Sequence, residues 1–84
     1  MSATRSLHVR FFAILREQAG CAQMQFDAEA ATPGTLYAEL QARFPGLTFP
    51  ATLLRVSVNE RYATMDTPLG ANDRVVFIPP VAGG

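Results

Sequence analysis

The chain has 84 residues, of which 49% are hydrophobic and 17% are charged, and its seven basic and seven acidic side chains give a net charge of zero. This length predicts one small domain, and the apolar fraction excludes an intrinsically disordered chain. The balanced charge argues against a nucleic-acid partner, and no apolar run reaches the roughly 18 residues that a membrane span needs.

The first third of the chain predicts two strands around a short helix. Apolar and polar residues alternate over residues 7–12, as in a half-buried strand. Residues 13–19 read as a short helix that ends at Gly20, because glycine readily takes the left-handed conformation of a helix C-terminus. Residues 21–28 alternate again and predict a second strand.

The main helix is predicted after the turn-forming residues 32–35. We expect Thr35 to cap it, since a threonine hydroxyl can accept from the first free amides of a helix. Apolar residues then recur every four positions at Leu36, Leu40 and Phe44, which is typical of an amphipathic helix of about ten residues. The prolyl-glycyl pair at 45–46 ends the helix, and residues 46–53 look irregular.

The last third predicts three strands. Residues 54–59 alternate, residues 59–61 read as a turn into a short strand over 62–64, and residues 67–73 are rich in turn formers. The final strand covers residues 74–78. Pro79 and Pro80 stop it, because proline cannot donate to a strand ladder.

These elements predict an α+β roll with a sheet of four or five strands packed on one main helix. The domain covers residues 1–78, and residues 79–84 form an extended tail. The helix is expected to cover the sheet face that carries the inward side chains Leu7, Val9, Phe11, Met24, Phe26, Val56, Val58, Val75 and Phe77.

The opposite sheet face has apolar residues among its polar ones. Alternation places Phe12, Val76 and Ile78 on it together with Arg10, besides His8, Arg55 and Ser57. An exposed apolar patch with a charged rim usually marks a partner site. We therefore predict a partner interface there, unless residues 46–53 or the N-terminus cover it.

The chain ends in a segment suited to enter another protein. Pro79 and Pro80 stiffen the exit from the fold, and Val81, Ala82, Gly83 and Gly84 follow. Glycine has no Cβ and can thread a narrow channel, and six extended residues reach about 20 Å. The reactive group would be the α-carboxylate of Gly84, a poor electrophile that needs activation, for example as an acyl-adenylate.

Few side chains offer other chemistry. Cys21 and His8 are the only cysteine and histidine, so neither an intrachain disulfide nor a Cys- or His-cluster metal site is expected. We interpret Cys21 as a small hydrophobe, His8 as a surface residue and Met24 as a core residue. Without a phosphate-binding loop or a nucleophile–base pair, the chain implies a separate activating enzyme. No targeting segment is recognisable, which predicts a cytoplasmic protein.

The sequence resembles the prokaryotic ubiquitin-like sulfur carriers, and most closely the small subunit of molybdopterin synthase. The resemblance runs from about residue 7 to the end. It rests on residues 10–17 (RFFAILRE), 56–59 (VSVN), 66–69 (DTPL), 73–75 (DRV) and, most specifically, 77–84 (FIPPVAGG). Asn72 stands where the family usually has glycine, and both residue types suit turns.

The resemblance implies a ubiquitin-like β-grasp fold with a mixed sheet. It also implies that a ubiquitin-activating-like adenylyltransferase uses ATP to adenylate Gly84, which then becomes a thiocarboxylate. The tail would insert into the large catalytic subunit and give its sulfur to cyclic pyranopterin monophosphate, in a heterotetramer of two large and two small subunits. This chain would bind no cofactor tightly and would supply no catalytic side chain.

Three alternatives stay open at the level of sequence. The chain could carry sulfur for thiamin, cysteine or tRNA thiolation instead. It could be a ubiquitin-like modifier whose Gly84 forms isopeptides with lysines of other proteins. It could also be a plain binding domain with an inert tail.

Overall fold

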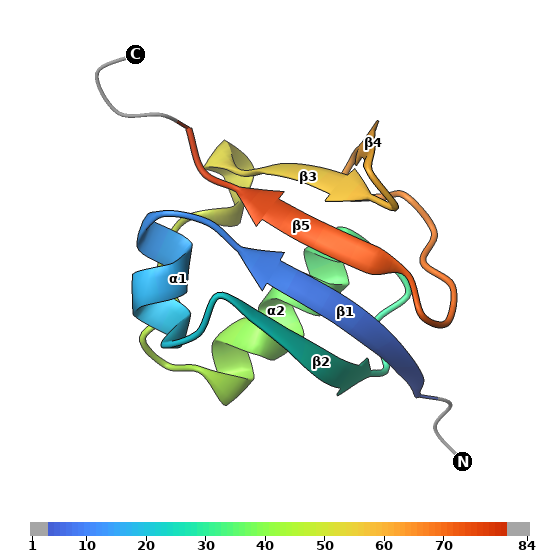
Figure 1. Cartoon of the computed structure of the whole chain (residues 1–84), viewed down its shortest axis with the longest axis horizontal. Coiled ribbons are helices and arrows are strands. Elements are labelled where there is room, and N and C mark those ends of the chain that lie inside the picture. The colour runs from blue at the N-terminus through green and yellow to red at the C-terminus, as the bar shows by residue number, and fades with distance from the viewer. Residues whose placement is uncertain (1–3, 81–84) are drawn as a thin grey trace.

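The computed structural model describes residues 4–80 (Figure 1). The elements follow the chain in the order β1 (Arg5–Phe11), α1 (Ile14–Ala19), β2 (Gln23–Ala28), α2 (Pro33–Arg43), the 3₁₀ helix η1 (Ala51–Leu53), β3 (Arg55–Val58), β4 (Arg61–Ala63) and β5 (Arg74–Ile78).

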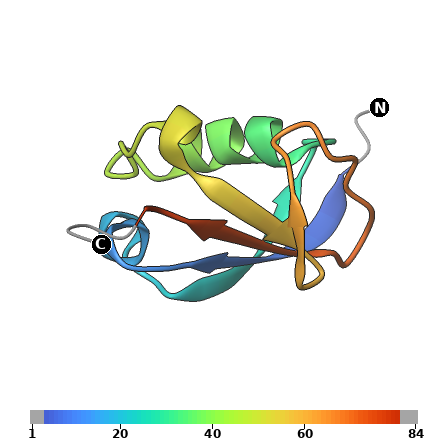
Figure 2. The same cartoon turned by 90° about the horizontal axis from the view of Figure 1, so that it is seen from above.

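The five strands form one mixed sheet in the order β2-β1-β5-β3-β4. β1 and β5 run parallel, and the other neighbouring pairs are antiparallel. The last strand in sequence is therefore the central strand of the sheet. Figure 2 shows α2 and η1 on one side of the sheet, while no described element covers the other side. This confirms the predicted α+β class and the mixed sheet packed on one main helix.

The core lies between α2 and the sheet, as the alternation predicts. Every strand residue expected to face inward belongs to this core or packs against it. Met24 and Val58 are partly buried, and the rest are at most 8% exposed: Leu7, Val9, Phe11, Phe26, Val56, Val75 and Phe77.

The start of α2 differs from the prediction. Thr32, not Thr35, is the N-cap, and the two residues form a reciprocal capping box. The Thr32 hydroxyl accepts from the N–H of Thr35 at 3.3 Å, while the Thr35 hydroxyl accepts from the N–H of Thr32 at 3.2 Å. The helix begins three residues early because Pro33 takes its first position, where the fixed φ and missing N–H of proline suit a helix.

The other boundaries differ by one or two residues. β1 begins at Arg5 and ends at Phe11, since Phe12 belongs to the turn into α1. β2 begins at Gln23, β3 covers residues 55–58 and β4 covers residues 61–63. The irregular segment 46–53 contains η1, whereas β5 and the end of α1 at Gly20 are as predicted.

The irregular segment is fixed to both helices by hydrogen bonds. The Gln18 side-chain oxygen accepts from the N–H groups of Thr48 at 3.0 Å and Phe49 at 3.1 Å. The Tyr37 hydroxyl donates to the carbonyl of Phe49 at 2.8 Å. The segment therefore lies on the helical side of the sheet and leaves the outer sheet face open.

Candidate functional site

The predicted tail leaves the fold at the end of the central strand. Ile78, the last residue of β5, pairs with Arg55 of β3, and Phe77 pairs with Phe11 of β1. Pro79 is buried and Pro80 is exposed. The remaining predicted tail residues, Val81, Ala82, Gly83 and Gly84, lie outside the described residues.

The exit is anchored to the main helix through Phe77. This side chain is fully buried, and its ring centroid lies 5.2 Å from that of Tyr37 of α2. Burial raises the pKa of the Tyr37 hydroxyl above its ordinary value of 10.0. The strand that carries the tail is thus held by both neighbouring strands and by the helix behind it.

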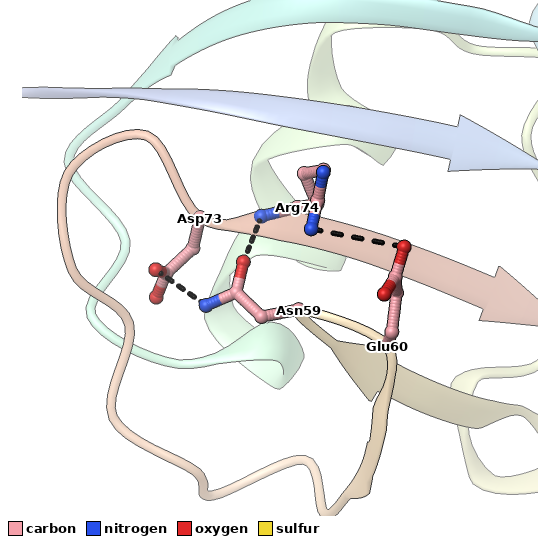
Figure 3. A network of polar contacts seen from close by, with 4 residues as sticks. All are labelled: Asn59, Glu60, Asp73 and Arg74. Atoms are coloured by element: carbon pink, nitrogen blue, oxygen red, sulfur yellow. Dashed lines mark hydrogen bonds and ion pairs between the residues drawn. The ribbon is translucent and has the colours of Figure 1, made fainter.

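The start of β5 is fixed by a polar network that sequence reasoning missed (Figure 3). The sequence predicts Asn59 only as a turn residue. Its side-chain amide donates to Asp73 at 2.9 Å, and its side-chain oxygen accepts from the N–H of Arg74 at 2.9 Å. The other oxygen of Asp73 accepts from the N–H of Gly70 at 2.7 Å. An exposed ion pair of 3.7 Å joins Arg74 to Glu60.

The four residues of the predicted partner interface lie together on the open sheet face. Arg10 pairs with Val76 in the parallel ladder, and its guanidinium carbon lies 5.1 Å from the ring centroid of Phe12. Phe12 is 40% exposed, whereas Val76 and Ile78 are half-buried because strands flank the central strand on both sides. We call these four residues the exit strip, since they end where the tail begins.

A strained turn borders the exit strip. Ala13 has φ 52° and ψ −126°, and the N–H of Leu15 donates to the carbonyl of Phe12 at 3.1 Å. This is the geometry of a type II′ turn, which favours glycine at the position of Ala13. The next side chain, Ile14, is 38% exposed beside Phe12. Sequence reasoning missed this corner, because alanine gives no turn signal.

A hollow lies on the other side of the exit, between η1, β3 and β4. Pro80 lines it together with Leu53 and Tyr62, which are 56% and 87% exposed. Sequence reasoning missed Leu53, because an irregular segment has no periodicity that shows which side chains face water. Apolar side chains therefore lie on both sides of the point where the chain leaves the fold.

The described side chains offer little other chemistry. Within residues 4–80, no group of three or more His, Cys, Asp or Glu side chains is placed to hold a metal ion. His8 is exposed, and Cys21 and Met24 are partly buried, with the latter two packed against the core. Among the described residues, the candidate site therefore consists of the end of β5 and the side chains around it.

None of the helices in residues 4–80 combines the length and the apolar character needed to cross a membrane.

Residues 9–84 match the model of the ThiS family. The molybdopterin synthase sulfur carrier subunit of Mycobacterium tuberculosis is 41% identical over 51 residues, which make up 61% of this chain and 61% of that protein. The matched part thus spans less than two thirds of this relative.

Two solved structures share the fold over almost their whole length. SAMP1 of Haloferax volcanii superimposes with a TM-score of 0.79 at 28% identity, covering 94% of this chain and 99% of that one. A chain of the complex of subunits 1 and 2 of molybdopterin-converting factor from Helicobacter pylori gives a TM-score of 0.62 at 29% identity, with coverages of 94% and 99%. These likenesses confirm the predicted ubiquitin-like β-grasp fold. Since the family model matches from the middle of β1 to the last residue, the chain belongs to the ThiS family.

Proposed function

We propose that this chain is the sulfur carrier of a molybdopterin synthase and that the α-carboxylate of Gly84 carries the sulfur. The observation that carries the proposal is the Gly-Gly end, which follows the central strand through only Pro79, Pro80 and two further residues. The 41% identity to the sulfur carrier subunit of M. tuberculosis supports it.

The carboxylate must first be activated, because it is anionic at neutral pH and a poor electrophile. In a separate adenylyltransferase, one carboxylate oxygen attacks the α-phosphorus of ATP, and pyrophosphate leaves. A hydrosulfide ion supplied by a sulfur donor then attacks the carbonyl carbon, and AMP leaves. The product is a thiocarboxylate on Gly84, in which one oxygen has been exchanged for sulfur.

The thiocarboxylate is then delivered into the large catalytic subunit of the synthase. Six residues from Pro79 onward can extend about 20 Å, so the chain end can reach an active site while the domain stays outside. There the sulfur passes to cyclic pyranopterin monophosphate, with the catalytic side chains supplied by the large subunit.

The exit strip is the surface that would bind the large subunit during delivery. It joins apolar side chains to a guanidinium directly at the base of the tail, and such a mixed patch is typical of a partner site. Phe12→Asp or Ile78→Asp should weaken binding of the large subunit in calorimetry and leave the fold intact. Ala42→Asp, on the exposed side of α2, is the matched control. Unchanged affinity of both exit-strip variants would remove the strip from the interface.

A second candidate function is that of a protein modifier, favoured by the likeness to SAMP1, a small archaeal modifier protein. In that case the amine of a lysine on another protein attacks the adenylated Gly84, AMP leaves, and an isopeptide forms. This chain contains no lysine, so a second copy offers no ε-amine as an acceptor.

Intact-mass measurement separates these functions. The chain is incubated with the adenylyltransferase, ATP and a sulfur donor. A mass gain of one oxygen-to-sulfur exchange supports a sulfur carrier, conjugates of higher mass support a modifier, and an unchanged mass contradicts both. The thiocarboxylate form is then given to the large subunit with cyclic pyranopterin monophosphate. Failure to convert this precursor would point to a carrier for thiamin, cysteine or tRNA thiolation.

A further inference from the structure

Among the residues that the structure describes, strand β2 forms one edge of the sheet and pairs only with β1. Its six residues run without a break and contain no proline or basic side chain, and Asp27 is its only charged residue. Natural proteins usually protect a strand edge with lysine, proline, a bulge or great shortness. The opposite edge, β4, is only three residues long and begins with Arg61. β2 is therefore the less protected edge.

The backbone N–H and C=O groups of every second β2 residue point away from β1, past the edge of the sheet. The N–H of Phe11 donates to the carbonyl of Ala22 at 2.8 Å, which makes these two residues a hydrogen-bonded pair of the antiparallel ladder. Hydrogen-bonded and non-bonded pairs alternate, so the N–H and C=O groups of Gln23, Gln25 and Asp27 face outward. No hydrogen bond among the described residues uses these six backbone groups.

The side chain at the middle of this edge does not cover it. Gln25 is exposed, and its amide nitrogen donates to the hydroxyl of Ser6 on β1. The side chain thus lies across the outer sheet face, toward the neighbouring strand. The backbone groups at the edge stay accessible to another strand.

We propose that two copies of the chain pair through their β2 edges, antiparallel and centred on Gln25. In this register, Gln25 faces Gln25 of the second copy, and each Gln23 faces Asp27 of the second copy. Each outward N–H then has a carbonyl opposite it. A register centred on Asp27 would instead place two carboxylates opposite each other, which destabilises a strand pair.

A second copy fits this edge better than a highly charged partner does. Each Asp27 carboxylate meets the amide of a Gln23, which can donate a hydrogen bond to it. The chain has a net charge of zero, so two copies approach without net repulsion. A single strand pair buries little surface, which predicts a weak and concentration-dependent dimer.

The dimer is compatible with the proposed delivery of the tail and independent of it. β1 separates β2 from β5 in the sheet, so both copies keep their β5 ends away from the shared edge. A two-fold axis through Gln25 makes the two β5 strands antiparallel, and the two tails leave at opposite ends.

Sedimentation equilibrium of the full chain, up to about 1 mM protein, tests the dimer and its register. Gln23→Glu places a carboxylate opposite Asp27 and should weaken association roughly 2- to 30-fold, since two such pairs form per dimer. Gln23→Arg should strengthen association by a similar factor. Gln41→Glu and Gln41→Arg make the same charge changes on α2 and should alter association little.

A backbone variant tests the edge itself. Gln25→Pro removes an N–H that makes no bond to β1, so it should abolish the dimer while the thermal unfolding curve shows a folded chain. A chain that stays monomeric up to about 1 mM, or two Gln23 variants with the same effect, would overturn the proposal. Sulfur loading of Gly84 is unaffected by either result, so a failed dimer leaves the proposed function in place.

Discussion

The ring of Tyr37 lies 5.2 Å from that of Phe77 at an angle of 54°, and so joins the main helix to the strand that carries the tail. The hydroxyl at the far end of the same ring donates to the carbonyl of Phe49 at 2.8 Å. Tyr37→Phe should keep the ring contact and lose only this hydrogen bond. We expect a loss of about 1 kcal/mol in the free energy of unfolding, measured by urea denaturation at pH 7.

The free energies of unfolding of the unchanged protein and of Tyr37→Phe should respond differently to alkaline pH. Burial raises the pKa of Tyr37 in the folded chain above 10.0. In the unfolded chain this tyrosine therefore ionises first, and its ionisation favours unfolding as the pH rises above 10. The stability advantage over Tyr37→Phe should be constant below pH 10 and shrink above it. An advantage that grows above pH 10 would contradict the assigned burial effect.

Asn59 should matter more than its exposed position suggests. Asn59→Ala removes hydrogen bonds to Asp73 and to the N–H of Arg74, and it places alanine at a φ of 53°, which asparagine tolerates better. We expect a loss of about 1–3 kcal/mol in the free energy of unfolding. Glu60→Ala is the control. It removes only an exposed ion pair and should change stability by less than about 1 kcal/mol.

Ala13→Gly should stabilise the protein. Ala13 has a conformation that glycine adopts without strain, and such strain costs on the order of 1–3 kcal/mol. The greater chain entropy of unfolded glycine offsets part of this gain, which leaves about 1 kcal/mol. Thermal unfolding of both variants measures these changes. Ala38→Gly, at an exposed position within α2, should lower the free energy of unfolding by about 1 kcal/mol. Equal losses in both variants would show that the Ala13 turn is unstrained.

Deletion of Gly84 should separate chemistry from stability. The truncated chain should lose the oxygen-to-sulfur mass gain, because its terminal carboxylate is displaced by one residue. Its thermal unfolding midpoint should match that of the full chain. Gly84→Ala should be measured beside the deletion, since it keeps a carboxylate at the same position and adds one methyl group. Normal sulfur loading with poor delivery to the large subunit would show that the path of the tail into that subunit requires glycine.

The sequence predicts which segments form the sheet better than it predicts where each helix and strand begins and ends. The bounds of β5 follow directly from the sequence, because turn formers precede Arg74 and Pro79 and Pro80 stop the strand. The start of α2 does not follow, because two threonines with a proline between them suit both a turn and a helix cap. Only the structure shows that Thr32 and Thr35 bond each other.

The parts of the candidate site that lie on strands can be predicted from the two-residue period of a strand. The parts that lie in turns and loops cannot be predicted in this way. Arg10 and Val76 could be placed on the open face from strand period alone. Ala13 could not be recognised, because its positive φ is imposed by the turn between β1 and α1. Asn59 and Asp73 are 14 residues apart, and their contact depends on how β3 and β5 pair.

The place of β5 between β1 and β3 also determines how the protein bears force. A pull on Pro80 acts along the axis of β5. The neighbouring strands β1 and β3 lie along the same axis, β1 in the same direction and β3 in the opposite one. The hydrogen bonds of the two ladders lie across the direction of the pull. The pull therefore loads them together in shear and does not break them one after another from one end. If the proposed function holds, a partner subunit can therefore pull on the residues after β5 while the domain at their base stays folded.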